Sequence, residues 1–252
     1  MENVGIINYK SGNIESLKNS QYLNLRQINM EIDFASRRRS KPLNSLADKA
    51  FHLIEEKIVT LQLKPGSLIS EVELSEEIDI GRTPVREALQ RLAHEGMISI
   101  LPRRGMIVSE VDIMNQLEIM DLRRVVDRMI AAKAAKRTTI EQKERLKEIA
   151  EDIEVTAKKG DIVGFMHLDG QFDQIMRTAA RNYFGTQISE TLHAHCRRFW
   201  YINREVSDLK RSAKLHARMM REIARGNQYK ACEASDALSD YIEDFTRSTL
   251  DN

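Results

Sequence analysis

The stretch GRTPVREALQRLAHEG, residues 81 to 96, decides the fold. Pro84 suits the first helical position, where its missing N–H is not needed, and Thr83 before it can cap the helix. Apolar side chains then recur at the spacing of one helix face: Val85, Ala88, Leu89 and Leu92. The stretch therefore predicts an amphipathic helix over 85–94 that stops at Glu95-Gly96.

The segments on either side complete a small domain. The patterns predict, in chain order, a helix over 45–61, a turn at 64–66, a short helix over 71–78, the helix above, and two strands over 97–101 and 106–109 joined by a turn at 102–105. Three helices followed by a hairpin are typical of a winged helix-turn-helix. A small helical bundle with an incidental hairpin is the alternative.

The placement of arginines favours the winged helix-turn-helix. The helix over 71–78 is acidic and carries no Lys or Arg. Basic side chains gather on or beside the next helix and at the hairpin tip, at Arg82, Arg86, Arg91, Arg103 and Arg104. A recognition helix enters the major groove with its N-terminal residues, and arginine forks match guanine edges and phosphate oxygens. The sequence therefore predicts double-stranded DNA as a partner, with a phosphate near the amides of Thr83 and Val85. A merely solvated basic surface is the alternative.

Composition bounds the remaining classes. The chain has 252 residues and a formal net charge of +1, so its basic character is local. Cys196 and Cys232 lie far apart, which argues against a zinc finger and against a disulfide scaffold. No apolar run approaches the roughly 18 residues that cross a bilayer, and the first residues do not resemble a signal peptide. We expect a cytoplasmic protein without a membrane partner.

The second half of the chain has helical periodicity throughout. It predicts six helices at about 112–136, 139–159, 161–180, 183–204, 206–225 and 228–249, with Gly160 and Gly226 as helix stops. The expected fold class is mainly α, a winged helix-turn-helix followed by an all-α bundle of about six helices. The expected domains are an N-terminal extension at 1–40, poorly ordered or loosely docked, a DNA-binding domain at 41–110 and a helical effector-binding and dimerisation domain at 111–252.

Residues 63–76, 81–96 and 102–108 together resemble the GntR family of regulators, as its turn and second helix, its recognition helix and its wing. Gly81 departs from the family pattern, which usually has Ser there, and loses a helix cap or phosphate contact. The resemblance implies that Arg82, Thr83 and Arg86 contact DNA and that the wing glycine Gly105 lies close to the groove.

Residues 121–127, 168–175 and 216–227 resemble the FadR-type ligand domain called FCD. Many members of that group bind a divalent metal ion through one Asp and three His. By this resemblance Asp169 matches the Asp and His216 one His, while Asp173 stands where another His is expected. The last His position falls near Leu238, which cannot ligate a metal, so the ligand set is incomplete.

Three interpretations of Asp169, Asp173 and His216 stay open at this point. They form an altered metal site for an ion of the Zn, Ni or Mn class, or line a metal-free pocket for an organic effector, or make a structural carboxylate–His pair. Arg123 matches an arginine of the opening FCD helix and could receive an effector carboxylate, with a surface role as the alternative. His193 and His195 are two apart and make a poor chelate, and Trp200 is expected in the core.

One further resemblance concerns residues 4–20, which are similar to the start of the glutamine amidotransferase subunit of imidazole glycerol phosphate synthase. Such an enzyme needs a nucleophilic Cys on a Gly-flanked elbow. Cys196 lies instead in a helical pattern without glycine, so we expect no enzyme activity. The basic run 37–39 is interpreted as a solvated linker, with an arm in the minor groove as the alternative.

The sequence thus predicts a homodimeric regulator of a near-palindromic operator, whose DNA affinity responds to a small carboxylate or other metabolite in the helical domain. The alternatives are a metal-responsive regulator, and an enzyme that uses Asp169, Asp173 and His216 as a hydrolytic metal site.

Overall fold

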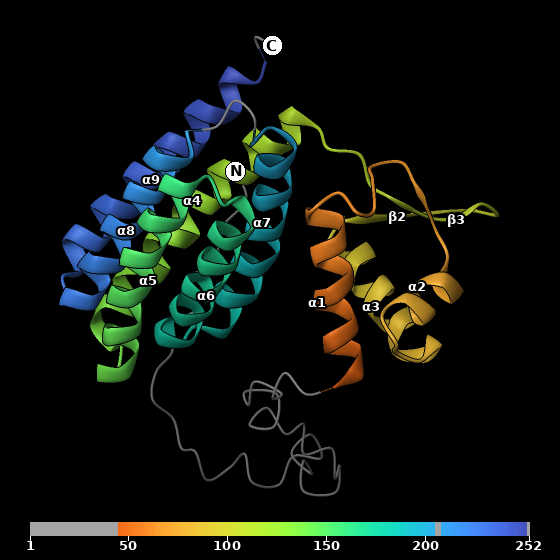
Figure 1. Ribbon diagram of the computed structural model, residues 1–252, viewed down its shortest axis with the longest axis horizontal. Coiled ribbons are helices and arrows are strands. Elements are labelled where there is room, and N and C mark those ends of the chain that lie inside the picture. Colours follow the sequence, from red (N-terminus) through yellow and green to blue (C-terminus); the bar gives the residue numbers. More distant parts are fainter. Residues whose placement is uncertain (1–44, 205–207, 251–252) are drawn as a thin grey trace, which may run out of the picture. The chain divides into compact units, whose positions relative to one another are not determined.

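The computed structural model describes residues 45–204 and 208–250 (Figure 1). The first domain runs, in chain order, α1 Leu46–Val59, β1 Leu68–Ile69, α2 Glu71–Glu77, α3 Arg82–His94, β2 Ile98–Leu101 and β3 Gly105–Val108. The strands form an antiparallel sheet in the order β1-β3-β2. The winged helix-turn-helix is confirmed, and the two-residue strand β1 is an addition that was not predicted.

Local signals and one shared core explain this domain. Ser45 and Ser70 cap α1 and α2, since their side chains accept hydrogen bonds from the amides of Asp48 and Glu73. The apolar stripe predicted for α3 is buried, and it packs with α1 and the hairpin around Phe51, Ile54, Ile58, Leu89, Leu92 and Met97. Packing on α1 therefore fixes which face of α3 is left for solvent.

The start of α3 differs from the prediction. The helix begins at Arg82 after Gly81, which offers no side-chain cap, so the prediction of a Thr83 cap and a start at Val85 was wrong. Pro84 is tolerated within the first turn because the amides there have no intrahelical acceptor. The N–H of Val85 donates to Gly81 O at 3.3 Å, so the first-turn amides left for an anion are those of Arg82 and Thr83.

The second domain is a bundle of the predicted six helices. They are α4 Ile113–Arg137, α5 Ile140–Lys159, α6 Ile162–Ala180, α7 Tyr183–Ile202, α8 Leu209–Arg225 and α9 Gln228–Ser248. Helix α5 packs along α8 and α4 along α9, around a core of alanines, leucines, isoleucines and methionines (Figure 1). Gly160 and Gly226 end α5 and α8 in the left-handed conformation, as predicted. No helix in the described part of the chain is both long and apolar enough to span a bilayer.

The predictions for residues 1–40, among them the likeness to an amidotransferase subunit and the basic run 37–39, lie outside the described residues. The domain boundaries at 41, 110 and 111 stay predictions.

Candidate nucleic-acid interface and effector cavity

The N-terminal turn of α3 presents Arg82, Thr83 and Arg86 to solvent. The guanidinium of Arg86 forms a fork with Glu71 of α2, with Nε–Oε2 at 3.0 Å and Nη2–Oε2 at 2.8 Å. This hydrogen bond and the charge of Glu71 raise the pKa of Arg86 above its usual value. The side chain of Arg86 is nevertheless 61% exposed, so a DNA phosphate or guanine edge can replace Glu71.

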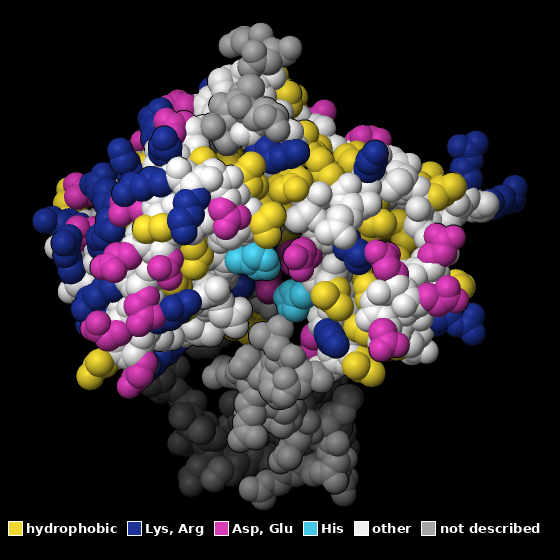
Figure 2. Space-filling model, in the orientation of Figure 1, with side chains coloured by type: hydrophobic (Ala, Val, Ile, Leu, Met, Phe, Trp, Pro, Cys, Tyr) yellow, Lys and Arg dark blue, Asp and Glu magenta, His cyan; other side chains and the backbone are white. Residues whose placement is uncertain are grey.

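The wing presents the second group of predicted DNA contacts. Arg103, Arg104 and Gly105 are exposed at the turn between β2 and β3, and basic side chains project from this end of the molecule in Figure 2. Gly105 has φ +92°, a conformation that L side chains rarely adopt, and no atom beyond its chain neighbours lies within 4 Å of the position that a Cβ would occupy. The backbone at this tip can therefore come close to a nucleic-acid surface.

Arg91 has a different environment from the other predicted DNA contacts. Its Nη1 lies 2.6 Å from Asp48 Oδ1, and its guanidinium stacks 4.1 Å above the ring of Phe51. Both partners belong to α1, so Arg91 holds α3 against α1. Its role in DNA binding stays a prediction.

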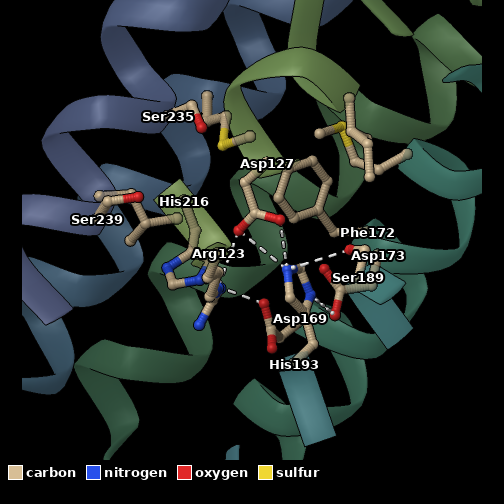
Figure 3. A pocket seen from close by; sticks show the side chains of 14 residues that line it. Arg123, Asp127, Asp169, Phe172, Asp173, Ser189, His193, His216, Ser235 and Ser239 are labelled. Carbon is tan, nitrogen blue, oxygen red and sulfur yellow. Dashed lines mark hydrogen bonds and ion pairs between the residues drawn. The ribbon is translucent and has the colours of Figure 1, made fainter. Parts of the chain in front are cut away.

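A chain of ion pairs lies inside the helical bundle, centred on His193 of α7 (Figure 3). His193 Nε2 is 2.8 Å from Asp127 Oδ1, and Nδ1 is 2.7 Å from Asp173 Oδ2. Arg123 Nε donates to the other oxygen of Asp127 at 2.8 Å, and Arg197 Nη1 donates to Asp173 at 2.8 Å. Arg123, Asp127, Asp173 and His193 are buried, and the side chain of Arg197 is 21% exposed.

The charges of this cluster follow from its geometry. Burial alone would lower the pKa of His193, but Asp127 and Asp173 raise it to about 9. Burial would raise the pKa values of the two carboxyls, but the neighbouring His193, with Arg123 beside Asp127 and Arg197 beside Asp173, lowers both. At neutral pH the cluster therefore holds three cations and two anions, with both N–H groups of His193 donating.

A second pair lies beside the cluster. His216 Nε2 of α8 is 3.2 Å from Asp169 Oδ1 of α6, and His216 Nδ1 donates to the carbonyl oxygen of Ser212 at 2.8 Å. The ring of Phe165 meets His216 edge to face. The backbone contact fixes the orientation of the imidazole, so that Nε2 faces Asp169 (Figure 3).

These groups form the wall of a cavity of about 490 Å³, including its opening. The basic and acidic side chains on this wall are those of Arg123, Asp169, His193, Arg197 and His216, and Cys196 and Tyr241 line it as well. The apolar part of the wall consists of Phe165 and Trp200, whose stacked rings have centroids 5.7 Å apart, together with Met166 and Ile242. Two guanidiniums and a protonated His193 face one carboxylate on this wall, and Asp127 and Asp173 pair with these three cations from behind it. Asp127 and Asp173 line a neighbouring cavity of about 420 Å³ instead.

Trp200 gives this cavity a free hydrogen-bond donor. Its indole Nε1 is buried and has no hydrogen-bond partner among the residues that the structure describes. A buried N–H without an acceptor is costly, and a ligand oxygen in the cavity could supply one. Trp200 also packs against the hydrophobic core of the bundle, as expected.

The structure brings together most of the predicted effector residues. Arg123, Asp169 and His216 line both cavities and Asp173 lines the smaller one. Sequence reasoning missed the participation of Asp127, His193 and Arg197. A signal was present, because Arg123 and Asp127 are four residues apart, as are His193 and Arg197, and such pairs share a helix face.

Comparison with known families agrees with both halves of this description. Residues 46–108 match the family of bacterial regulatory proteins, gntR family, and residues 118–240 match the FCD domain. The chain is a GntR-type transcription regulator with an FCD domain. Its placement in the FadR subfamily stays a prediction.

Known proteins similar to this GntR-type regulator are regulators as well. It is 26% identical over 162 residues to the HTH-type transcriptional repressor RspR of Escherichia coli strain K12, covering 64% of this chain and 71% of the relative. It is 24% identical over 215 residues to the HTH-type transcriptional regulator LutR of Bacillus subtilis strain 168, covering 73% and 96%. The solved structure of E. coli McbR/YncC has a TM-score of 0.72 at 19% identity, over 82% of this chain and 99% of that one, so the two share a fold.

The cavity residues of this GntR-type regulator do not form the metal site expected from the FCD resemblance. Asp169 and His216 are two suitable donors, but Leu238, which lines the same cavity near the expected last ligand position, cannot ligate a metal, and Asp173 already binds His193 and Arg197. Among residues 45–204 and 208–250, no group of three or more His, Cys, Asp or Glu is arranged to hold a metal ion. The donor set does not fit a closed site for an ion of the Zn, Ni or Mn class.

Proposed function

We propose that this regulator binds a specific operator as a homodimer and that a small organic acid in the FCD cavity changes its operator affinity. The observation that carries the DNA-binding part is the exposed basic surface of Arg82 and Arg86 on α3 and of Arg103 and Arg104 on the wing. These two elements are the ones that a winged helix presents to the major groove and the phosphate backbone.

The chemistry of the cavity wall supports an anionic effector. Arg123 and Arg197 bind Asp127 and Asp173 through Nε and Nη1, so their other N–H groups can bind a carboxylate, while Phe165 and Trp200 offer an apolar face to the rest of the molecule. Trp200 Nε1 can donate to a ligand oxygen. An organic acid of moderate size, with an aromatic or aliphatic body, matches all three features.

The homodimer is supported by an exposed apolar face on α4 and α7. Leu122 and Val125 on α4, and Phe184 and Ile188 on α7, are between 45% and 76% exposed, and the two helices pack side by side. A second copy of this chain is the occupant we propose, because a near-palindromic operator needs two recognition helices. Sedimentation of wild type and Val125→Glu tests this, with a dimer expected for wild type and a monomer for the variant. A monomeric wild type at micromolar concentration would refute the dimer.

Operator selection tests the proposal directly. Duplexes are selected from a random-sequence pool with the full chain, and affinity is then measured by fluorescence anisotropy for wild type, Arg86→Ala and Arg145→Ala. Arg145 is the matched control, since it is also exposed and paired with a glutamate, Glu148. We expect a specific duplex whose binding is weakened in Arg86→Ala and unchanged in Arg145→Ala. Failure to enrich any sequence would contradict the proposal.

The effector is sought through Trp200, the one tryptophan of the chain. Its fluorescence is recorded against a panel of aliphatic and aromatic carboxylates, and each compound that changes it is tested for an effect on operator affinity. Metal analysis of the purified chain runs alongside. About one bound ion per chain would support the metal-responsive alternative, and ester hydrolysis abolished by a chelator would support the hydrolase. We infer that the regulator has no enzyme activity and acts in the cytoplasm, where bacterial DNA lies.

A further inference from the structure

We propose that helix α7 couples the effector cavity to the DNA-binding domain, with Arg197 as the positioning residue of this coupling. The inference rests on the proposed function, because it assigns a route to the regulation proposed there. It follows from side chains on two faces of one helix and from one arginine that lies between them.

One face of α7 belongs to the effector cavity. His193, Cys196 and Trp200 line the cavity. Ser189, four residues before His193, has its hydroxyl 3.4 Å from His193 Nε2. The spacing of 4, 3 and 4 residues places all four on one side of the helix. Any ligand in the cavity therefore contacts α7 directly.

The other face of α7 belongs to the winged helix. Ala194 is 1% exposed and is part of the hydrophobic core around α1, α3 and β3. His195 Nε2 lies 2.7 Å from the carbonyl oxygen of Glu95, the residue that caps the C-terminus of recognition helix α3. Arg198 donates to the carbonyl oxygen of Ser109, directly after the wing. The recognition helix and the wing are thus both held by α7.

Arg197 lies between the two faces and binds unequally to each. Its Nη1 donates to Asp173 Oδ2 at 2.8 Å, whereas its Nη2 is 4.0 Å from Glu55 Oε1 of α1. Glu55 is 8% exposed, and its Oε1 has no hydrogen-bond partner within the described parts of the chain. A buried carboxylate oxygen without a donor is costly, so Glu55 competes with Asp173 for the same guanidinium.

Arg197 also lies between the effector cavity and another cavity beside α1. A third cavity, of about 650 Å³ including its opening, is lined by Glu55 and Val59 of α1, by Thr60 directly after it and by residues of α6. Only Arg197 and Met166 line both this cavity and the effector cavity, among the described residues. Met166 also packs against both hydrophobic cores. These two side chains therefore separate the effector site from the DNA-binding domain.

This arrangement gives the coupling a direction. A carboxylate bound in the effector cavity draws the guanidinium of Arg197 toward itself and leaves Glu55 without its only nearby cation of α7. The contact of α1 with α7 is then weakened, and the hold of α7 on α3 with it. Neutralising Asp173 does the reverse, because Arg197 is then free to close on Glu55.

The test is a double-mutant cycle on the full chain, read by hydrogen exchange, which needs neither DNA nor effector. Asp173→Asn, Glu55→Gln and their combination are compared by the exchange rates of amides in residues 46–59 and 82–98. Glu222→Gln and Glu56→Gln are matched controls, one a buried carboxylate of the bundle that pairs with Arg225 and the other an exposed neighbour of Glu55. Circular dichroism checks that each variant keeps its helix content.

We expect Asp173→Asn to slow exchange in both segments by about threefold or more, and to have no such effect in the Glu55→Gln background. Each control substitution should change the exchange rates by the same factor in the wild-type and Glu55→Gln backgrounds. Equal effects of Asp173→Asn in the two backgrounds would overturn the inference. If Asp173→Asn unfolds the bundle, Arg197→Lys replaces it, since lysine keeps the charge but cannot bind both carboxylates. In the Arg197→Lys background, Glu55→Gln should no longer change the exchange rates of these amides. The same change as in wild type would overturn the inference. Failure of operator selection would instead refute the proposed function and leave this cycle interpretable.

Discussion

The DNA-reading surface and the bundle interior use the same kinds of ion pair in opposite environments. Arg86 and Glu71 have side chains that are 61% and 23% exposed, whereas those of Arg123 and Asp127 are both 10% exposed. Water screens an exposed pair and makes it weak, so Arg86 can exchange Glu71 for DNA at little cost. A buried pair that loses one partner costs about 3–5 kcal/mol. Exposed charges are therefore available to a ligand, while buried ones fix the geometry that a ligand meets.

The largest effect is expected from a substitution in the buried cluster of ion pairs. His193→Ala leaves Asp127 and Asp173 without their shared cation, and we expect a loss of about 3–5 kcal/mol in the free energy of unfolding. Urea unfolding followed by Trp200 fluorescence measures it. His167→Ala, an exposed histidine of α6, is the control and should stay within about 0.5 kcal/mol of wild type. Equal stability of the two variants would show that the cluster does not hold the bundle.

The pH dependence of stability tests the charge of the same buried cluster. Because the pKa of folded His193 is raised to about 9, its contribution is complete below the unfolded value of about 6.5 and is lost as the pH rises through 9. We expect roughly 3 kcal/mol of stability to disappear across this window. Urea unfolding at several pH values compares wild type with His193→Gln, in which this loss should be absent. Parallel profiles for the two proteins would contradict the assigned charge of His193.

The same contrast explains what the sequence could predict. The stripe of Val85, Ala88, Leu89 and Leu92 repeats within one helix, so local spacing predicted α3 and its exposed arginines. Gly160 and Gly226 likewise marked the ends of α5 and α8. The start of α3 was missed, because proline is accepted at several positions of a first turn.

The cluster around His193 could not be predicted in the same way. Asp127, Asp173 and His193 come from α4, α6 and α7, and the imidazole contacts a carboxylate 66 residues away. Which helices pack together is decided by the apolar core, and local spacing carries no information about it. The sequence therefore identified Arg123, Asp169, Asp173 and His216 by resemblance and missed Asp127, His193 and Arg197.

Substitutions in the exposed ion pair of Arg86 and Glu71 test the DNA-reading surface. Arg86→Ala should weaken binding to the selected operator by about 1–3 kcal/mol, whereas Glu71→Gln should strengthen it by less than about 1 kcal/mol, since the guanidinium is then free. Anisotropy titrations at one salt concentration measure both. Weaker binding in both variants would mean that Glu71 positions Arg86 for DNA and does not compete with it.

The smallest expected effect concerns the wing. Arg104→Ala should lower the affinity about equally for all duplexes and reduce the dependence of log affinity on log salt by roughly one contact. Titrations at several salt concentrations on the selected and a scrambled duplex measure this. A changed sequence preference with an unchanged salt dependence would instead assign Arg104 to a base edge.

The most direct test of the account is an anisotropy titration of the full chain on its selected operator, with and without a carboxylate that changes Trp200 fluorescence. A scrambled duplex of the same composition is the control. The account predicts at least tenfold tighter binding to the operator, and a shift in that affinity when the carboxylate is present. Equal binding to both duplexes, or an operator affinity that the bound carboxylate does not change, would contradict it.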